Sequence, residues 1–328
     1  IVGVVNNGSG ALGGHVYNQS VVISQAYDKP FWLMGCSVTL HDPTPGDGNA
    51  VIQIAASASS PGSYNIFLMD LHAADSAYAG IESTGNGRYL RNENVLSNGV
   101  GFKINGNNNT IHNGSATSNG VGVWISGDSN TATDTNAYSN TSHGVQVNGN
   151  GNQILKIDSG DSGKGNGGDG FNVTGDSNLL SEDDAFSNTG NGFKVLGNSN
   201  TILKGRSGDS GKGNGTVATQ GDGYNVAGSG NAFQESRASA NKGDGWDVSG
   251  GVMGSPNKFK SILSNTGSSG SATLENAGSE FRLSGYVLNN GGGNKADNVA
   301  IPKTTAPVKC NLFPVTNATA DVNFSCGD

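Results

Sequence analysis

Two nearly identical glycine-rich segments carry the residues whose spacing first suggests chemistry. They read ILKIDSGDSGKGNG from Ile154 and ILKGRSGDSGKGNG from Ile202, so each places a lysine directly after a glycine. A P-loop that binds phosphate requires a glycine six residues before the lysine and a Ser or Thr after it. Asp158 and Arg206 occupy the first of these positions, and glycine follows each lysine. The spacing therefore excludes a P-loop.

Lysine and aspartate together suggest a different reaction, the β-elimination of a sugar acid. Such a site needs carboxylates that hold a cation such as Ca²⁺ and a Lys or Arg base beside them. The candidate catalytic residues are Lys194, Asp161 and Asp209, and the candidate Ca²⁺ ligands are Asp158, Asp161 and Asp209. Aspartates in glycine-rich loops also cap turns with their side chains, which is the structural alternative. No other cofactor is expected.

A repeat of about 22 residues organises most of the chain and must position these residues. Each copy begins with Gly, apolar, any residue, apolar, and continues through a glycine turn to an asparagine, as in GFKINGNNNTI from Gly101 and GVWISGDSNTA from Gly122. Three short strands per copy predict an all-β solenoid of parallel coils about 4.8 Å apart. Alternation within a strand directs Phe102 inward and Lys103 outward.

Asparagines recur at fixed positions of the repeat, so stacked coils would align them in ladders. A side-chain amide can donate to one neighbouring coil and accept from the other, which satisfies polar groups at the turns. The first predicted structural ladder comprises Asn109, Asn130, Asn152, Asn178, Asn200, Asn231 and Asn257. A second comprises Asn98, Asn119, Asn140, Asn188, Asn241 and Asn265.

The repeat resembles the right-handed parallel β-helix repeat family, which has the pectin-lyase-like fold of NosD-type and polysaccharide-processing proteins. The resemblance rests on the Gly-apolar-x-apolar strand and the asparagine turn, and it covers residues 50–290. It implies a right-handed, single-stranded parallel β-helix of about ten coils. Lyases, hydrolases, epimerases, phage spikes and adhesins share this fold, so the fold does not select a function. The Asp-Pro-His signature of alginate epimerase modules is absent, because Asp42-Pro43 is followed by Thr44.

One outward-facing column of the first strand contains residue types that suit sugar rings and hydroxyls. In enzymes of the resembled family, substrate lies along such a face, which long turns border. An aromatic platform, amides and isolated charges form the predicted substrate-binding set, namely Glu82, Lys103, Trp124, Gln146, Asn172, Lys194, Asn225 and Asp247. The duplicated loops are expected to flank Lys194. The alternative is a face that is merely solvated. Glu82 and Asp247 lie seven coils apart, too far for a glycosidase pair.

Composition narrows the classes of partner. Only 13% of residues are charged, the net charge is −8, and there is no block of Lys or Arg. These properties argue against nucleic acid or an anionic membrane surface as a partner. No apolar run approaches the roughly 20 residues of a spanning helix. The expected partners are therefore a second copy of the chain or a polysaccharide.

Three regions are expected along the chain. Residues 1–49 form N-terminal coils or an edge segment, residues 50–290 form the β-helix, and residues 291–328 form a tail that caps the last coil or contacts a neighbouring subunit. Cys310 and Cys326 in this tail are close enough in sequence to form a disulfide. A disulfide together with the polar composition predicts an extracellular or cell-surface location.

These features predict a secreted β-solenoid scaffold that self-associates as a fibre or surface-layer subunit, or adheres through a glycan contact. A polysaccharide lyase or another carbohydrate-active enzyme of the pectin-lyase-like fold is the alternative function.

Overall fold

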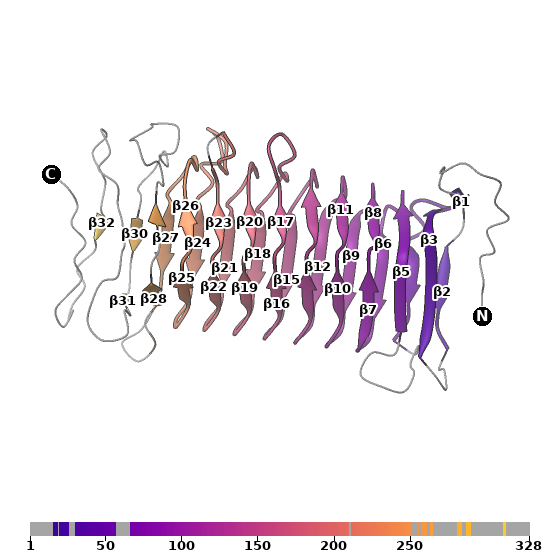
Figure 1. Cartoon of the computed structure of the whole chain (residues 1–328). Helices are drawn as coiled ribbons and strands as arrows, with labels where there is room; N and C mark the ends of the chain where they lie inside the picture. Colours follow the sequence, from indigo (N-terminus) through magenta and orange to yellow (C-terminus); the bar gives the residue numbers. More distant parts are fainter. Residues whose placement is uncertain are drawn as a thin grey trace.

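The computed structural model describes residues 16–18, 20–25, 30–56, 66–209, 211–250, 255, 257–260, 263–264, 281–283, 287–289 and 311–312. These residues form an all-β parallel solenoid of about nine turns, with roughly 22 residues per turn and no helix. Figure 1 shows the coils stacked side by side from the N-terminal strands to the C-terminal ones. The predicted fold class is confirmed.

Each coil contributes strands to three faces. The first face is a twelve-stranded parallel sheet. It is built from β2 (Val21–Ile23), β4 (Ala50–Ile54), β6 (Ala79–Thr84), β9 (Val100–Asn105), β12 (Val121–Ser126), β15 (Val145–Asn148), β18 (Phe171–Thr174), β21 (Phe193–Leu196), β24 (Tyr224–Ala227), β27 (Trp246–Ser249), β30 (Phe281–Leu283) and β32 (Asn311–Leu312).

The second and third faces begin as one sheet, because β3 (Phe31–His41) and β5 (Ile66–Ala74) are long enough to cover both. The second face continues with β7 (Arg88–Arg91), β10 (Thr110–His112), β13 (Thr131–Thr133), β16 (Gln153–Leu155), β19 (Leu179–Ser181), β22 (Thr201–Leu203), β25 (Ala232–Gln234), β28 (Asn257–Lys260) and β31 (Val287–Asn289). The third face holds β1 (Val16–Asn18), β8 (Asn94–Leu96), β11 (Ser115–Thr117), β14 (Asn136–Tyr138), β17 (Asp158–Ser159), β20 (Asp184–Ala185), β23 (Arg206–Ser207), β26 (Arg237–Ala238) and β29 (Leu263–Ser264).

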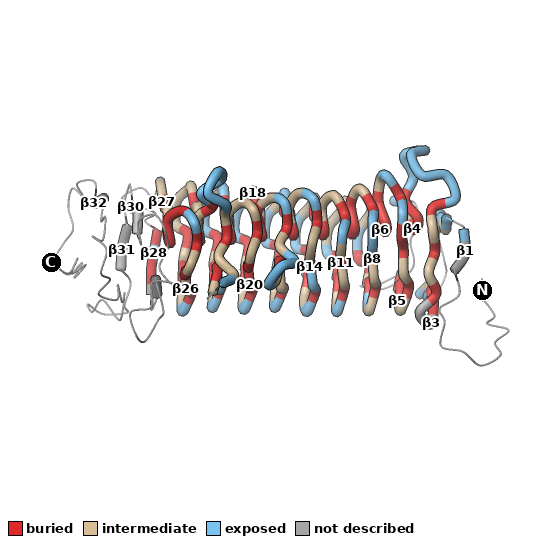
Figure 2. Tube along the Cα trace, turned by 90° about the horizontal axis from the view of Figure 1, so that it is seen from above, coloured by how far each residue is buried: buried red, intermediate tan, exposed pale blue. Residues whose placement is uncertain are grey.

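The core is a narrow column of side chains that stack from coil to coil. Alternation along each strand sends every second residue inward, which produces the repeated pattern of buried and half-buried residues (Figure 2). On the first face, the ring of Phe193 stacks on Phe171 at 4.7 Å between centroids and on Tyr224 at 4.8 Å. Tyr224 in turn stacks on Trp246 at 3.9 Å. Burial of these aromatic rings holds adjacent coils in register.

Asparagine ladders lie at two inner corners, as predicted. In the first ladder, the Oδ1 atom of Asn130 accepts the backbone N–H of Asn109 at 2.9 Å, and the Oδ1 of Asn152 accepts that of Asn130 at 2.8 Å. The same bond repeats through Asn178, Asn200, Asn231 and Asn257. The residue before many of these asparagines has a left-handed backbone, with φ 56° at Ser129 and 59° at Ser177. The ladders therefore satisfy the polar backbone of a tight corner.

The second ladder differs from the prediction at two coils. Its order is Asn98, Asn119, Asn140, Asn166, Asn188, Asn214 and Asn241. Asn166 and Asn214 are the last asparagines of the two duplicated segments, so each insertion ends by returning the chain to the ladder. The predicted member Asn265 lies outside the described residues.

The glycine that opens each strand of the first face is required by this ladder. A Cβ atom on Gly122 would lie 2.6 Å from the carbonyl oxygen of Gly144 and 2.7 Å from the Nδ2 atom of Asn140. Contacts this short do not occur for real Cβ atoms, so the position accepts only glycine without a shift of the backbone.

Candidate functional site

The predicted outward column lies in one register on the first face. Strand pairing aligns Trp124 with Gln146, Asn172 with Lys194, and Lys194 with Asn225. The complete aligned column is Gln53, Glu82, Lys103, Trp124, Gln146, Asn172, Lys194, Asn225 and Asp247. Residues far apart in sequence therefore form one continuous surface, with coils about 4.8 Å apart.

In the N-terminal part of this column, the charged side chains bond to one another and to neighbouring polar groups. Glu82 is 5% exposed, and its carboxylate accepts from Tyr78 Oη at 2.9 Å and Asn105 Nδ2 at 3.2 Å. Lys103 Nζ lies 3.2 Å from the same carboxylate and also donates to the Tyr78 hydroxyl. The expectation of isolated charges is wrong for Glu82 and Lys103, because each neutralises the other.

Trp124 is half-buried at the edge of a small apolar cluster on the outer surface. Its indole packs against this cluster, which includes Ala79, Val100 and Tyr78. When the amide of Asn148 is turned so that its oxygen faces the indole, Trp124 Nε1 donates to that oxygen at 3.3 Å. The indole is therefore held in place on both its apolar and its polar side, as an aromatic platform requires.

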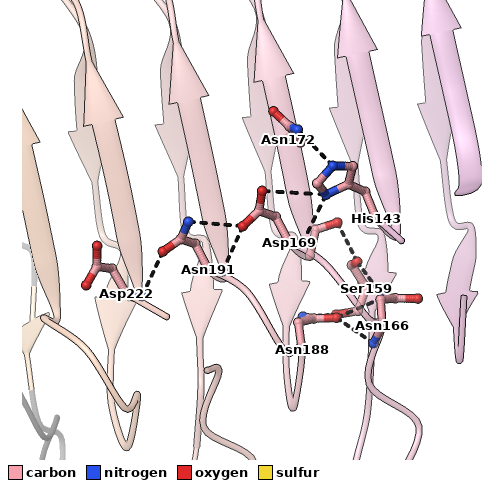
Figure 3. Close-up of polar contacts among 9 residues, drawn as sticks. His143, Ser159, Asn166, Asp169, Asn172, Asn188, Asn191 and Asp222 are labelled. Carbon is pink, nitrogen blue, oxygen red and sulfur yellow. Dashed lines mark hydrogen bonds and ion pairs between the residues drawn. The ribbon is translucent and has the colours of Figure 1, made fainter. Parts of the chain in front are cut away.

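A second outward column lies just upstream of the strands, and its character changes at His143. We call it the upstream column; it contains the residue directly before each strand-opening glycine. Its N-terminal members are apolar, whereas its later members are His143, Asp169, Asn191, Asp222 and Asp244. Figure 3 shows how four of them, His143, Asp169, Asn191 and Asp222, connect coil to coil. Asp169 Oδ1 accepts the backbone N–H of Asn191, and Asn191 Oδ1 accepts that of Asp222, both at 2.8 Å.

His143 is held as a neutral imidazole with its proton on Nε2. The backbone N–H of Asp169 points at Nδ1 from 3.0 Å, so Nδ1 must accept and cannot carry a proton. The Nδ2 atom of the Asn172 amide lies 3.1 Å from Nε2. A neutral ring must carry one proton, so Nε2–H can donate only when this amide is turned to bring its oxygen to the same position.

Burial favours this neutral form. Desolvation is the largest effect on the pKa of His143 and lowers it below 6.5; the Asp169 carboxylate raises this pKa, and the ammonium of Lys194, a smaller effect, lowers it. The Asp169 carboxylate approaches Nδ1 at 3.5 Å. The first face therefore presents a neutral donor, an amide and an ammonium group on His143, Asn172 and Lys194, which belong to three successive coils.

The aspartates of the duplicated segments lie elsewhere. Asp158 belongs to β17 on the third face, where it pairs in register with Asp184. Asp161 accepts from Lys212 Nζ at 2.7 Å, which joins the two duplicated loops to each other. These loops rise from the same edge of the solenoid, near β17 and β23 (Figure 1).

The two loops turn toward the third face rather than toward Lys194. Lys164 lies 6.0 Å from the ring centroid of Tyr138, and Lys212 lies 5.6 Å from that of Phe186. Both rings follow or belong to third-face strands. Both duplicated segments nevertheless adjoin the coil of Lys194, because Asn166 O accepts the backbone N–H of Thr189 at 2.8 Å and Lys212 O accepts that of Ser187 at 3.0 Å. A further lobe, residues 215–221, also contacts this coil, where Thr219 Oγ1 donates to the carbonyl of Thr189 at 2.5 Å. The loops therefore flank the coil of Lys194 through their backbone, while their lysine side chains lie beside third-face rings.

The sequence-predicted catalytic and metal residues are not brought together. Lys194 lies on the first face, whereas Asp161 and Asp209 belong to the duplicated loops. Among the residues that the structure describes, no three His, Cys, Asp or Glu side chains are grouped so that they could hold a metal ion. Ca²⁺ binding by Asp158, Asp161 and Asp209 stays a prediction.

His143 is the site residue that sequence reasoning missed. At the same position of later coils, Asp169 and Asp222 accept backbone N–H groups, as side chains that cap turns do. The available signal was a histidine in a column that otherwise holds Asp or Asn, one coil before Asn172.

Protein-family models give no match to this chain, and no curated protein matches it. Solved structures do. The mannuronan C-5 epimerase AlgE6 A-module of Azotobacter vinelandii is 14% identical, with 89% of this chain and 90% of that chain covered and a TM-score of 0.54. The mannuronan C-5 epimerase AlgE4 A-module of the same organism is 11% identical, with 80% of this chain and 91% of that chain covered and a TM-score of 0.42. The enzymatically active domain of bacteriophage CBA120 tailspike protein 2 is 10% identical, with 83% of this chain and 42% of that chain covered and a TM-score of 0.33.

Of these three, the AlgE6 module alone exceeds a TM-score of 0.5. At 14% identity the likeness shows the fold, and the chain shares the parallel β-helix of the pectin-lyase-like class. By their names, two of the three structures are mannuronan C-5 epimerase modules and the third is an enzymatically active tailspike domain. The described part of this chain contains no helix of the length and hydropathy that a membrane crossing needs.

Proposed function

We propose that this chain is an extracellular carbohydrate-active protein that binds an acidic polysaccharide lengthwise along its first face. The binding surface runs from Trp124 to Asp247 and has its centre at His143, Asn172 and Lys194. Extracellular location is supported by the polar composition and by the predicted Cys310–Cys326 disulfide.

The observation that carries this proposal is the set of three polar groups on successive coils. His143 Nε2–H, the amide of Asn172 and the ammonium of Lys194 line one open stretch of surface in a register fixed by strand pairing. The ammonium of Lys194 beside the Asn172 amide suits a carboxylate, and His143 adds a second donor once its ring leaves Asn172. The platform of Trp124 lies two coils from Asn172, so a chain of sugars can contact both.

Polysaccharide lyase activity is the second candidate function, and the neutral state of His143 favours it. In a β-elimination, the base removes the proton at C5 of a uronate, the C4–C5 double bond forms, and the C4–O bond breaks with protonation of the departing oxygen. Lys194 and Asn172 would neutralise the uronate carboxylate. His143 would accept the proton only after Nδ1 is released from the Asp169 backbone, so ligand binding must move the ring. This scheme gives no catalytic role to Asp161 or Asp209.

Self-association as a fibre or surface-layer subunit is a separate proposal. It is supported by the parallel solenoid itself, an architecture whose end strands can pair with a further copy where no cap covers them. Negative-stain microscopy of the purified chain tests it, because ordered polymers support a scaffold and dispersed particles contradict it. The two proposals are compatible, since the first face runs parallel to the solenoid axis.

Binding along the first face is tested with Lys194→Ala against a matched control, Lys204→Ala. Lys204 is a lysine of the same coil, but it lies at the corner beyond the second face, where its Nζ is 3.8 Å from the Glu182 carboxylate. We expect Lys194→Ala to weaken binding of uronate oligosaccharides by about tenfold, the loss of one charge-assisted hydrogen bond. The control should bind like the wild type.

Four outcomes separate the candidates. Loss of uronate binding in Lys194→Ala alone supports the proposal, whereas equal binding by both variants contradicts it. Formation of unsaturated uronate from a panel of uronic-acid polysaccharides would add the lyase activity. Binding of neutral glucans and uronates with equal affinity would contradict the acidic class of ligand.

A further inference from the structure

His143 has a different set of hydrogen-bond partners available in each protonation state. In the neutral ring, Nδ1 accepts the Asp169 backbone N–H at 3.0 Å, and Nε2 faces the Asn172 amide at 3.1 Å, so Nε2–H donates to this amide when its oxygen is turned toward the ring. Both ring nitrogens are then satisfied. The imidazole is fixed between the backbone of Asp169, just before β18, and the outward side chain of Asn172 in β18 (Figure 3).

Protonation of Nδ1 is incompatible with this arrangement. The new N–H would face the backbone N–H of Asp169, and two donors cannot share that contact. The carboxylate of the same residue offers the alternative, because Asp169 Oδ2 lies 3.5 Å from Nδ1. The cationic ring must therefore turn toward Oδ2. This movement withdraws Nε2–H from Asn172 and leaves the amide free to bind a ligand.

The charges that face His143 are known on both sides. Downstream, they are the carboxylate of Asp169 and the ammonium of Lys194. Upstream, the preceding coil presents Val121 and Trp124, which do not titrate in this range. Lys194 and burial oppose a second positive charge in the free protein. An anion bound between the two cations would remove this repulsion, so ligand binding and proton uptake must favour each other.

We propose that His143 makes the centre of the first face a proton-dependent anion site. At mildly acidic pH, the imidazolium of His143 and the ammonium of Lys194 hold an anionic sugar substituent over Asn172. At neutral pH, His143 returns to the Asp169 backbone and Asn172, and the substituent is held by Lys194 alone. This inference rests on the proposed binding of an acidic polysaccharide at the same residues.

The test combines binding with a direct measurement of the ring. Uronate oligosaccharides and a neutral glucan are titrated calorimetrically into the full chain between about pH 8 and about pH 5, a range in which carboxylates with pKa near 4 stay ionised. Affinity for the uronates is expected to rise about three- to tenfold toward acidic pH, and affinity for the glucan to stay constant. NMR of the imidazole in the free protein should place its pKa below 6.5 and show the Asn172 side-chain amide shifting with the same midpoint.

Two variants and one control make the result decisive. His143→Gln should remove the pH dependence, and Asp169→Asn should move it to lower pH because the imidazolium loses its carboxylate. His112→Gln is the control, since His112 also lies beside an aspartate, 3.6 Å from Asp134, but away from the first face. A pH dependence that survives in His143→Gln would overturn the inference while leaving the proposed function standing. Uronate binding absent at every pH, with the Asn172 amide still following His143, would instead overturn the proposed function.

Discussion

Lys212 Nζ lies 2.7 Å from Asp161 Oδ1, so the two copies of the duplicated loop are joined across two coils of the solenoid. Lys212 is the largest cause that holds the pKa of Asp161 below its usual range. Both side chains are more than one-third exposed, so solvent screens the pair. Lys212→Met should therefore lower the free energy of unfolding by less than about 1 kcal/mol.

Thermal melting measures this effect, and Lys164→Met is the matched control from the other copy of the loop. The two variants should differ only slightly. A loss in Lys212→Met as large as that of a core substitution would mean that the loop pair is a principal source of stability, contrary to this expectation.

Buried ladder asparagines should be far more sensitive than exposed ones. Asn130→Ala leaves the backbone N–H of Asn109 and the carbonyl of Gly106 without partners at a buried corner. We expect a loss of about 1–3 kcal/mol of unfolding free energy in chemical denaturation. Asn150→Ala is the control, because the exposed Asn150 accepts the N–H of Asp176 in the same way at 2.8 Å. Water can replace Asn150, so equal losses for the two variants would refute the ladder explanation.

Asp183 predicts a pH dependence of stability. It is fully buried, and its Oδ1 accepts the N–H of Ile157 at 2.8 Å while its Oδ2 has no partner. Burial is the main cause that raises its pKa well above 3.8. The unfolded chain releases this proton above about 3.8, whereas the folded chain retains it. Stability should therefore fall as pH rises above that value, until the folded group itself ionises.

Asp183→Asn removes the titrating group and should flatten this part of the profile. Unfolding by denaturant at several pH values is the measurement, and Glu182→Gln, an exposed neighbour, is the control. A profile of Asp183→Asn that matches the wild type would show that the buried carboxyl does not contribute.

Adjacent residues of β21 should separate stability from binding. Phe193 is fully buried between Phe171 and Tyr224, so Phe193→Ala should cost about 3–5 kcal/mol. Lys194→Ala, on the outer side of the same strand, should change stability by less than about 0.5 kcal/mol. Calorimetric melting of both variants checks the direction that each side chain faces. Similar losses would contradict the register of the first face.

The tail makes a covalent prediction that lies outside the described residues. If Cys310 and Cys326 are bridged, one of the three cysteines reacts as a free thiol in denaturant without reductant. Three react once reductant is added. The bridge should stabilise the tail by roughly 3 kcal/mol. Three free thiols in freshly secreted protein would exclude it.

The fold could be predicted because the repeat specifies which residues of adjacent coils align. Gly-apolar-x-apolar strands and corner asparagines recur at nearly constant spacing, so the column from Gln53 to Asp247 followed from alignment of the copies. Asn166 and Asn214 were missed because insertions shift them away from that spacing. Only the stacking of coils reveals that each insertion rejoins the ladder at its last asparagine.

The candidate site was only partly predictable. Asn172 and Lys194 followed from the column, but His143 belongs to the upstream column and contacts Asn172 from the preceding coil. Sequence alignment also gave no warning that Glu82 and Lys103 pair across adjacent coils, because it orders residues along the axis without showing how far side chains reach. The period of the repeat predicts the register of the strands, whereas side-chain contacts depend on the rotamers, which the period does not specify.

The bond between Lys212 and Asp161 spans a unit of two coils, and the duplicated segment repeats with that unit. A translation by two coils carries each loop onto the position of the next. The molecule therefore has the geometry of an extensible rod, in which another two-coil module inserted at this point would meet a complementary acid or base on its neighbour. We expect length to be the property of this protein that can change with the least rearrangement of its remaining surface.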